Sequence, residues 1–329
     1  MLWKPICDQK SDKAQFNFCA NPDAALAFTV LFGLSFCVHV LQSFTFRKRF
    51  CWVVCMAAAW EFVGFATRVY ATKDQLKDTT GSVASILVLL APLWVNAFVY
   101  MVFGRLVYYF LPDQKIGGIR AVNMAKWFVW LDITAFLIQL TGGVLTTLDE
   151  DVKTIKLGLR LYTIGIGVQE GFVVLFLGLA IRFHWKMVKG HGRIDRGNGW
   201  AKLMYTVYGT LAMITVRIIF RLCEFADGNV NNKLATTEVY FYVLDAVPMW
   251  LALVAWNIIH PGLVLEGPES EFPKKPSRRE KNKVKRANKE AKKAMKLEER
   301  ERRHHRKHTH RRIHSDADGI LLSDRGVMV

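Results

Sequence analysis

The chain alternates between seven long apolar segments and short polar connections over most of its length. Each segment has about 20 residues or more, which an α-helix needs to cross the hydrocarbon core of a bilayer. None shows the ten-residue alternation of a membrane β-strand. The pattern predicts an all-α integral membrane bundle of seven transmembrane helices. The segments are Asn21–Phe46, Phe50–Tyr70, Val83–Phe110, Ala125–Leu145, Leu157–Phe183, Ala201–Leu222 and Val239–His260.

Lysine and arginine are concentrated in the connections after the first, third and fifth segments. The first connection contains Arg47, Lys48 and Arg49, and the fifth contains a longer series that begins at Arg182 and ends at Lys202. The other three connections are poorer in basic residues. Because basic connections tend to stay in the cytoplasm, the amino terminus is predicted to lie outside and the carboxyl terminus in the cytoplasm.

This topology divides the chain into an extracytoplasmic segment (1–20), a transmembrane domain (21–262) and a basic cytoplasmic tail (263–329). The net charge is +17 although 52% of the residues are hydrophobic. Much of the excess charge lies in the tail, which is predicted to be disordered or partly helical. A sharper hypothesis is that the tail binds anionic lipids of the inner leaflet. Nucleic-acid binding does not fit a chain with seven membrane spans.

Two pairs of small residues allow alternative interpretations. Cys7 and Cys19 flank the segment before the first span. They could form a disulfide outside the cell or stay separate, because spacing alone gives no geometry. Gly167 and Gly171 form a Gly-x-x-x-Gly pattern that could let a neighbouring helix approach closely. They could equally be two unrelated glycines in a glycine-rich segment.

Charged and amide side chains also occur inside the apolar segments, where an unpaired charge is unfavourable by several kcal/mol. Arg217, Arg221 and Glu224 follow the spacing i, i+4, i+7 and therefore share one face of a helix. Two interpretations stay open. The charges could form an interhelical ion-pair network, or they could line a polar cavity that receives the head group of an amphipathic ligand.

We assign these residues to two groups as hypotheses. The candidate ligand-binding residues are Glu61, Arg68, Asn96, Gln169, Glu170, Arg217 and Asp245. The candidate residues of a structural ion-pair or hydrogen-bond network are Arg105, Asp132, Gln139, Arg221 and Glu224. Within these groups, Asp245 is favoured for a ligand contact, whereas Arg221 and Glu224 are favoured to contact each other.

These residues lie in runs that resemble the signatures of a known family. The runs are EFVGFATR (Glu61–Arg68), LLAPLWVNAFVYMVFGR (Leu89–Arg105), FVWLDITAFLIQLTGG (Phe128–Gly143), GIGVQE (Gly165–Glu170), VRIIFRLCEFADG (Val216–Gly228), EVYFYVLDAVPM (Glu238–Met249) and HPG (His260–Gly262). In order and spacing they resemble the fungal lipid-translocating exporter family, a group of seven-helix proteins related to the yeast aminocholesterol-resistance protein. The resemblance extends from about Asn21 to Gly262 and leaves out the tail.

The resemblance implies a fungal multi-pass membrane protein, often of the plasma membrane. It also implies export or translocation of sphingoid long-chain bases or sterol-like amphiphiles, and resistance to toxic amphiphiles. One branch of the family is linked to porphyrin traffic. The alternative is a seven-helix receptor or sensor for amphiphilic ligands that signals through cytoplasmic partners.

The residues do not form a catalytic constellation that we can identify, so the chain is predicted not to be an enzyme and to use no cofactor or metal. The last apolar segment, for example, contains no lysine that could form a retinal Schiff base. The expected partners are membrane lipids and an amphipathic lipid or sterol-like ligand.

Overall fold

The computed structural model describes residues 7, 18–73, 75, 80–148, 151–192, 198–225, 233–273, 279, 282–283, 285–296 and 298–299. The chain divides into two compact units, Met1–Phe272 with the membrane helices and Pro273–Val329 with most of the basic tail. The first unit therefore continues past residue 262, where the sequence placed the end of the transmembrane domain.

Seven helices in the described residues are long and apolar enough to cross a membrane, which confirms the predicted all-α fold. The first six are α1 (Pro22–Phe46), α2 (Trp52–Ala71), α3 (Thr80–Phe110), α4 (Ala121–Leu148), α5 (Val152–Val188) and α6 (Gly199–Phe225). The seventh span, Glu238–Leu263, combines α8 (Glu238–Phe241), the π-helical segment η3 (Tyr242–Ala246), α9 (Val247–Ile258) and the 3₁₀ turn η4 (Pro261–Leu263).

The remaining elements are short and lie in or next to the connections. They are η1 (Arg49–Cys51), β1 (Lys115–Ile116), β2 (Ile119–Arg120), α7 (Lys233–Thr236) and η5 (Pro268–Ser270). β1 and β2 form an antiparallel hairpin in which Ile116 faces Ile119. Gly117 and Gly118 make its turn with positive φ angles of 57° and 81°, a conformation that glycine adopts readily.

The seventh span is interrupted where a proline follows the π-helical segment. Pro248 lies in the first turn of α9 and has no N–H to donate to the preceding turn. A π-helical turn contains one more residue than an α-helical turn, and such turns are frequent at functional sites. Asp245 lies inside this wider turn and is fully buried. The irregularity therefore affects the direction of an ionisable side chain in the membrane.

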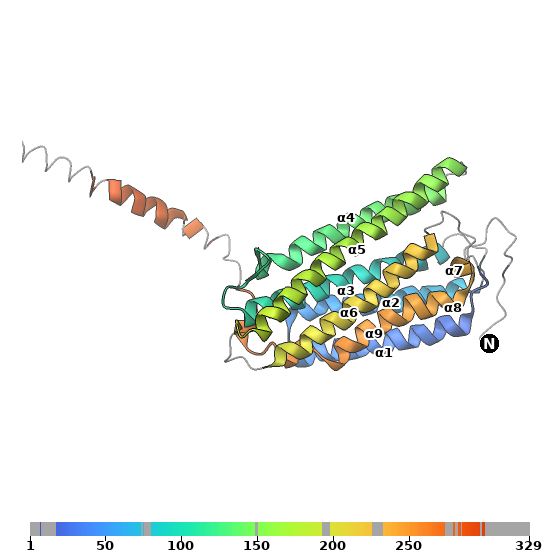
Figure 1. Ribbon diagram of the computed structural model, residues 1–329, viewed down its shortest axis with the longest axis horizontal. Helices are drawn as coiled ribbons and strands as arrows, with labels where there is room; N and C mark the ends of the chain where they lie inside the picture. Colours follow the sequence, from blue (N-terminus) through green and yellow to red (C-terminus); the bar gives the residue numbers. More distant parts are fainter. Residues whose placement is uncertain are drawn as a thin grey trace, which may run out of the picture. The chain divides into compact units, whose positions relative to one another are not determined.

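α4 and α5 form a long hairpin that diverges from the other helices toward the α4–α5 connection (Figure 1). At the opposite end, α5 is held by aromatic contacts. The ring of Phe176 lies 4.6 Å from that of Tyr100, 5.0 Å from that of Phe103 and 5.1 Å from that of Phe128. These edge-on contacts join α5 to α3 and α4.

The hairpin itself is held together by glycines that allow close helix contact. A Cβ atom at Gly142 would lie 2.5 Å from the backbone nitrogen of Tyr162, and one at Gly158 would lie 2.7 Å from the carbonyl oxygen of Gly142. A Cβ atom at Gly167 or Gly171 would meet nothing within 4 Å in the described chain. Close approach therefore uses Gly142 and Gly158, and the Gly-x-x-x-Gly pattern is not a helix contact within the described chain.

Replacing Gly158 with valine is expected to destabilise the hairpin. The new side chain would overlap the backbone of α4, and overpacking of this kind costs about 1–3 kcal/mol. The melting temperature in detergent should fall by about 3–10 °C. Gly167→Val is the matched control, because it adds the same side chain to the same helix in open space. Equal melting temperatures for the two variants would contradict this interpretation of the glycines.

The described part of the second unit is helical and basic. Lys285, Lys289, Lys292 and Lys296 recur every three or four residues, so they share one face of the helix. All four side chains are exposed. Residues 300–329, also predicted to belong to the tail, lie outside the described residues.

Candidate functional site

Arg217 on α6 is the centre of a buried charged cluster that lies between the membrane helices. Its Nε atom lies 2.8 Å from Oδ1 of Asp245, and Nη1 lies 3.7 Å from Oε1 of Glu61. Nη2 donates a hydrogen bond of 2.9 Å to the carbonyl oxygen of Val88 on α3. One guanidinium group therefore connects α6 with α2, α3 and η3.

Arg221, one turn further along α6, extends this cluster toward the end of the helix. It lies 2.5 Å from Oδ2 of Asp245 and donates to Glu224 at 3.0 Å. The side chains of Arg221 and Glu224 are 18% and 13% exposed, whereas that of Asp245 is not exposed. The cluster therefore runs from a fully buried part at Glu61 and Asp245 to a partly accessible part at Arg221 and Glu224.

A cavity of about 330 Å³ lies next to the accessible part of the cluster. Most of its lining is apolar and comes from α3, α4, α5 and α6. Three charged residues complete it, namely Arg68, Arg221 and Glu224. Its lining residues on α4 and α5 belong to the half of the hairpin near the α4–α5 connection, and Figure 1 shows that the hairpin diverges from the other helices toward this connection. Small-molecule sites combine apolar walls with a few polar groups in this way.

The residues before α1 form part of the cavity wall. We call the described residues Cys7 and Phe18–Asn21 the strap, and the end of the bundle where α1 begins the strap end. The strap contains a disulfide between Cys7 and Cys19, which resolves the alternatives that the sequence left open. Phe18 lines the cavity together with Phe241 of α8.

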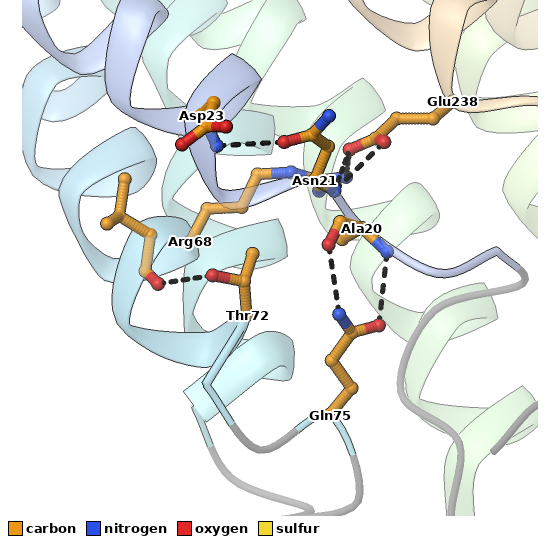
Figure 2. A network of polar contacts seen from close by, with 8 residues as sticks. Ala20, Asn21, Asp23, Arg68, Thr72, Gln75 and Glu238 are labelled. Atoms are coloured by element: carbon orange, nitrogen blue, oxygen red, sulfur yellow. Dashed lines mark hydrogen bonds and ion pairs between the residues drawn. The ribbon is translucent and has the colours of Figure 1, made fainter. Parts of the chain in front are cut away.

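Polar contacts at α2, α8 and the α2–α3 connection hold the strap in place (Figure 2). The amide side chain of Gln75 accepts from the backbone N–H of Ala20 at 3.1 Å and donates to its carbonyl oxygen at 3.0 Å. The carboxylate of Glu238 accepts from the backbone N–H of Asn21 at 3.0 Å. The Arg68 side chain reaches this carboxylate at 4.0 Å.

Arg68 connects the strap to the cavity. Its guanidinium lies 4.3 Å from the ring centroid of Phe241 and 5.6 Å from that of Phe18. Cation–π contacts of this length are attractive, by about 0.5–2 kcal/mol depending on desolvation. The residue is 4% exposed but contributes to the cavity lining. Arg68 therefore places positive charge in the cavity wall, beside the rings of Phe18 and Phe241.

Replacing Gln75 with alanine is expected to loosen the strap. It removes two hydrogen bonds from a buried backbone segment, and each unsatisfied group costs about 1–3 kcal/mol. Hydrogen exchange of the peptide that contains Ala20 and Asn21 should become faster. Gln42→Ala is the control, because Gln42 donates to the carbonyl of Asn257 far from the strap. Unchanged exchange in Gln75→Ala would show that these bonds do not hold the strap.

The other predicted site residues form pairs that link neighbouring helices. Asp132 of α4 accepts from Asn96 at 2.9 Å and from the Tyr100 hydroxyl at 3.0 Å, both on α3. Gln139 of α4 donates to Gln169 of α5 at 2.8 Å. These pairs place Asn96 and Gln169, both candidates for ligand contact, in interhelical hydrogen bonds.

Glu170 and Arg105 lie outside the cavity lining. Glu170 accepts from the Thr215 hydroxyl at 3.0 Å and joins α5 to α6. Arg105 is near the opposite end of the bundle, with its guanidinium 3.8 Å from the ring centroid of Phe50 and 4.8 Å from that of Phe272. Arg105 thereby holds the chain after the seventh span against α3.

The structure thus brings five predicted residues into one cluster: Glu61, Arg217, Arg221, Glu224 and Asp245. Sequence reasoning missed Phe18, Gln75 and Tyr162 as parts of the site. Phe18 and Gln75 lie outside the apolar segments, so hydropathy gives no signal for them. Glu238 is the first residue of the run EVYFYVLDAVPM. Its position at the start of the seventh span could have indicated a contact with the chain before α1.

Comparison with known proteins places the chain among fungal membrane proteins. The family model described as RTA1 like protein matches residues 54–268. The probable lipid transporter atnI of Emericella nidulans is 46% identical over 268 residues, which cover 78% of this chain and 70% of that protein. Protoporphyrin uptake protein 1 of Saccharomyces cerevisiae is 32% identical over 200 residues, covering 60% of this chain and 64% of that protein.

A more distant relative is named for a sphingoid lipid. The sphingoid long-chain base transporter RSB1 of Saccharomyces cerevisiae is 22% identical over 286 residues, which cover 74% of this chain and 72% of that protein. No solved structure matches the chain.

Proposed function

Because the chain belongs to the RTA1 like protein family, we propose that it is a lipid transporter that moves an amphipathic lipid across the membrane. The observation that carries the proposal is the cavity at the strap end, which combines mostly apolar walls with a group of charged residues. Arg68 and Arg221 both lie beside the ring of Phe241, and Glu224 contacts Arg221. An amphipathic lipid has the same division into an apolar chain and a charged head group. The names of relatives, which include a probable lipid transporter, support this class of substrate.

The head group would meet Arg68, Arg221 and Glu224. A protonated amine, as in a sphingoid base, would pair with the carboxylate of Glu224, and a phosphate would pair with Arg68 or Arg221. The sequence offered Glu61, Glu170 or Asp245 as the partner of the amine, and Glu170 lies outside the cavity lining. We move this contact to Glu224, because the side chains of Glu61 and Asp245 are 1% and 0% exposed and face the arginines of α6.

Transport by purified protein tests the proposal. The protein would be reconstituted into phosphatidylcholine vesicles that contain a fluorescently labelled sphingoid base, and its movement between leaflets would be followed by quenching from outside. Movement faster than in protein-free vesicles is expected. A protein that binds the lipid without moving it, and recruits cytosolic partners when the lipid is present, would instead be a receptor.

We also propose that the strap end faces the outside of the cell. The disulfide of the strap and the basic connections at the opposite end of the bundle support this orientation. The test uses intact cells and a variant that lacks the exposed Cys37 and Cys223. An impermeant thiol reagent should label Cys7 and Cys19 only after treatment with an impermeant reductant. Labelling that also requires permeabilised cells would reverse the orientation.

We further propose that the tail helix contacts anionic lipids of the inner leaflet of the plasma membrane. The lysine face at Lys285, Lys289, Lys292 and Lys296 carries this proposal, because each basic residue near such a surface contributes about 1 kcal/mol. A tail peptide should bind vesicles that contain phosphatidylserine and be released by high salt. Equal binding to neutral vesicles would exclude an electrostatic contact.

A further inference from the structure

Glu61 stands out because it is a buried acid without hydrogen bonds. Its residue exposure is 0%, and neither carboxyl oxygen has a hydrogen-bond partner in the described chain. The nearest cation is Arg217, at 3.7 Å. An ionised carboxylate in such a place is unfavourable unless it is paired and hydrogen-bonded.

Arg217 is engaged elsewhere in this arrangement. Its Nε atom contacts Asp245 at 2.8 Å, and Nη2 donates to the Val88 carbonyl. Asp245 also contacts Arg221. Of the two acids beside Arg217, Asp245 therefore has two close cations. Within the described residues, Glu61 has a single cation, Arg217, at a longer distance.

Within the part of the chain that the structure describes, three charged groups act on Glu61. The charged groups that act on it are Arg217 and Arg221 of α6 and Asp245 of η3. The neighbouring helices contribute apolar side chains one turn along α2, where Phe32 of α1 stacks on Phe65 and Val88 of α3 lies against Gly64. The charge on Glu61 therefore depends on where the arginines lie.

A second, smaller cavity lies beside Arg217, the cation that contacts Glu61. Its volume is about 30 Å³, enough for one or two water molecules. Arg217, Arg221, Tyr162 and Gln139 contribute to its polar lining, and Tyr162 and Arg221 also line the main cavity. Arg217 lines this small cavity and also contacts Glu61. A movement of the Arg217 side chain would therefore both pair Glu61 and expose it to water.

We infer that Glu61 is a proton-binding site that exchanges its proton for a cationic head group in the main cavity. This inference rests on the proposed function. An amine that pairs with Glu224 weakens the contact between Glu224 and Arg221, so the charge of Arg221 is left to Asp245, which it already contacts. Arg217 is then released toward Glu61, which ionises and gives its proton to water in the small cavity. The lipid keeps its charge, and one proton leaves for each amine that binds.

The first test measures proton release in detergent. Saturating amounts of a sphingoid base would be added to the purified protein in weakly buffered solution with a pH-sensitive dye. About one proton per bound lipid is expected for the native protein, and none for Glu61→Gln, which keeps the shape of a protonated acid. Lipid binding without proton release by the native protein would overturn the inference, and this result does not depend on whether the variant folds.

The second test measures transport under a pH difference. One pH unit is a tenfold difference in proton concentration, so the native rate should change by up to about that factor. Glu61→Gln should lose the response, and the control Glu170→Gln should keep it, because Glu170 pairs with Thr215 and does not line the main cavity. If the native protein moves no lipid, the proposed function fails. If it moves lipid with no response to pH, or if Glu61→Gln responds like the native protein, only this inference fails.

Discussion

Replacing Arg217 with methionine is expected to remove most of the correctly folded protein. Arg217 is the only cation within 4 Å of Glu61 in the described chain, and it also contacts Asp245 and the Val88 carbonyl. Breaking a buried ion pair by removing one partner costs about 3–5 kcal/mol. We expect a large loss of monodisperse protein in size-exclusion chromatography and a lower melting temperature.

Two further variants separate loss of charge from loss of shape. Arg217→Lys keeps the charge but not the three-way geometry of the guanidinium, so an intermediate result is expected. Neutralising the acids in the triple variant Arg217→Met, Glu61→Gln, Asp245→Asn should recover much of the folded protein. Arg160→Met is the control, because Arg160 is exposed on α5. A native melting temperature for Arg217→Met would show that the cluster does not support the fold.

The fold could be predicted from hydropathy because each span is a local property of the chain. The ends agree to within a few residues for most spans, as at Phe46 and Phe110. The α4–α5 hairpin is longer than predicted, because α4 continues to Leu148 and α5 already begins at Val152. Its tip contains polar residues that a hydropathy threshold excludes, although they continue the helices.

The charged cluster was only partly predictable. The spacing of Arg217, Arg221 and Glu224 places them on one helical face, and α6 bears this out. The sequence could not show which acid pairs with which arginine, because the direction of the Asp245 side chain depends on the π-helical turn η3. The extra residue in that turn rotates the side chains that follow, and an apolar pattern does not reveal it. The strap was missed for another reason: contacts such as Gln75 with Ala20 join residues far apart in the chain.

Filling the main cavity should abolish transport while leaving the fold intact. Gly143 of α4 lines the cavity, and a Cβ atom there would meet nothing within 4 Å. Gly143→Trp can therefore place an indole ring in the space proposed for the lipid without displacing backbone. We expect transport of a labelled sphingoid base to fall by about tenfold or more, which corresponds to a loss of about 1.4 kcal/mol or more.

The matched control is Gly171→Trp. Gly171 lies on the exposed face of α5, outside the cavity lining, and a Cβ atom there also meets nothing within 4 Å. Both variants add the same ring to a helix of the same hairpin, so their difference isolates the cavity. Both should elute as monodisperse protein with melting temperatures close to the native value. Equal transport by the two variants would mean that the lipid takes another route, because only Gly143→Trp reduces the volume beside Arg68, Arg221 and Glu224.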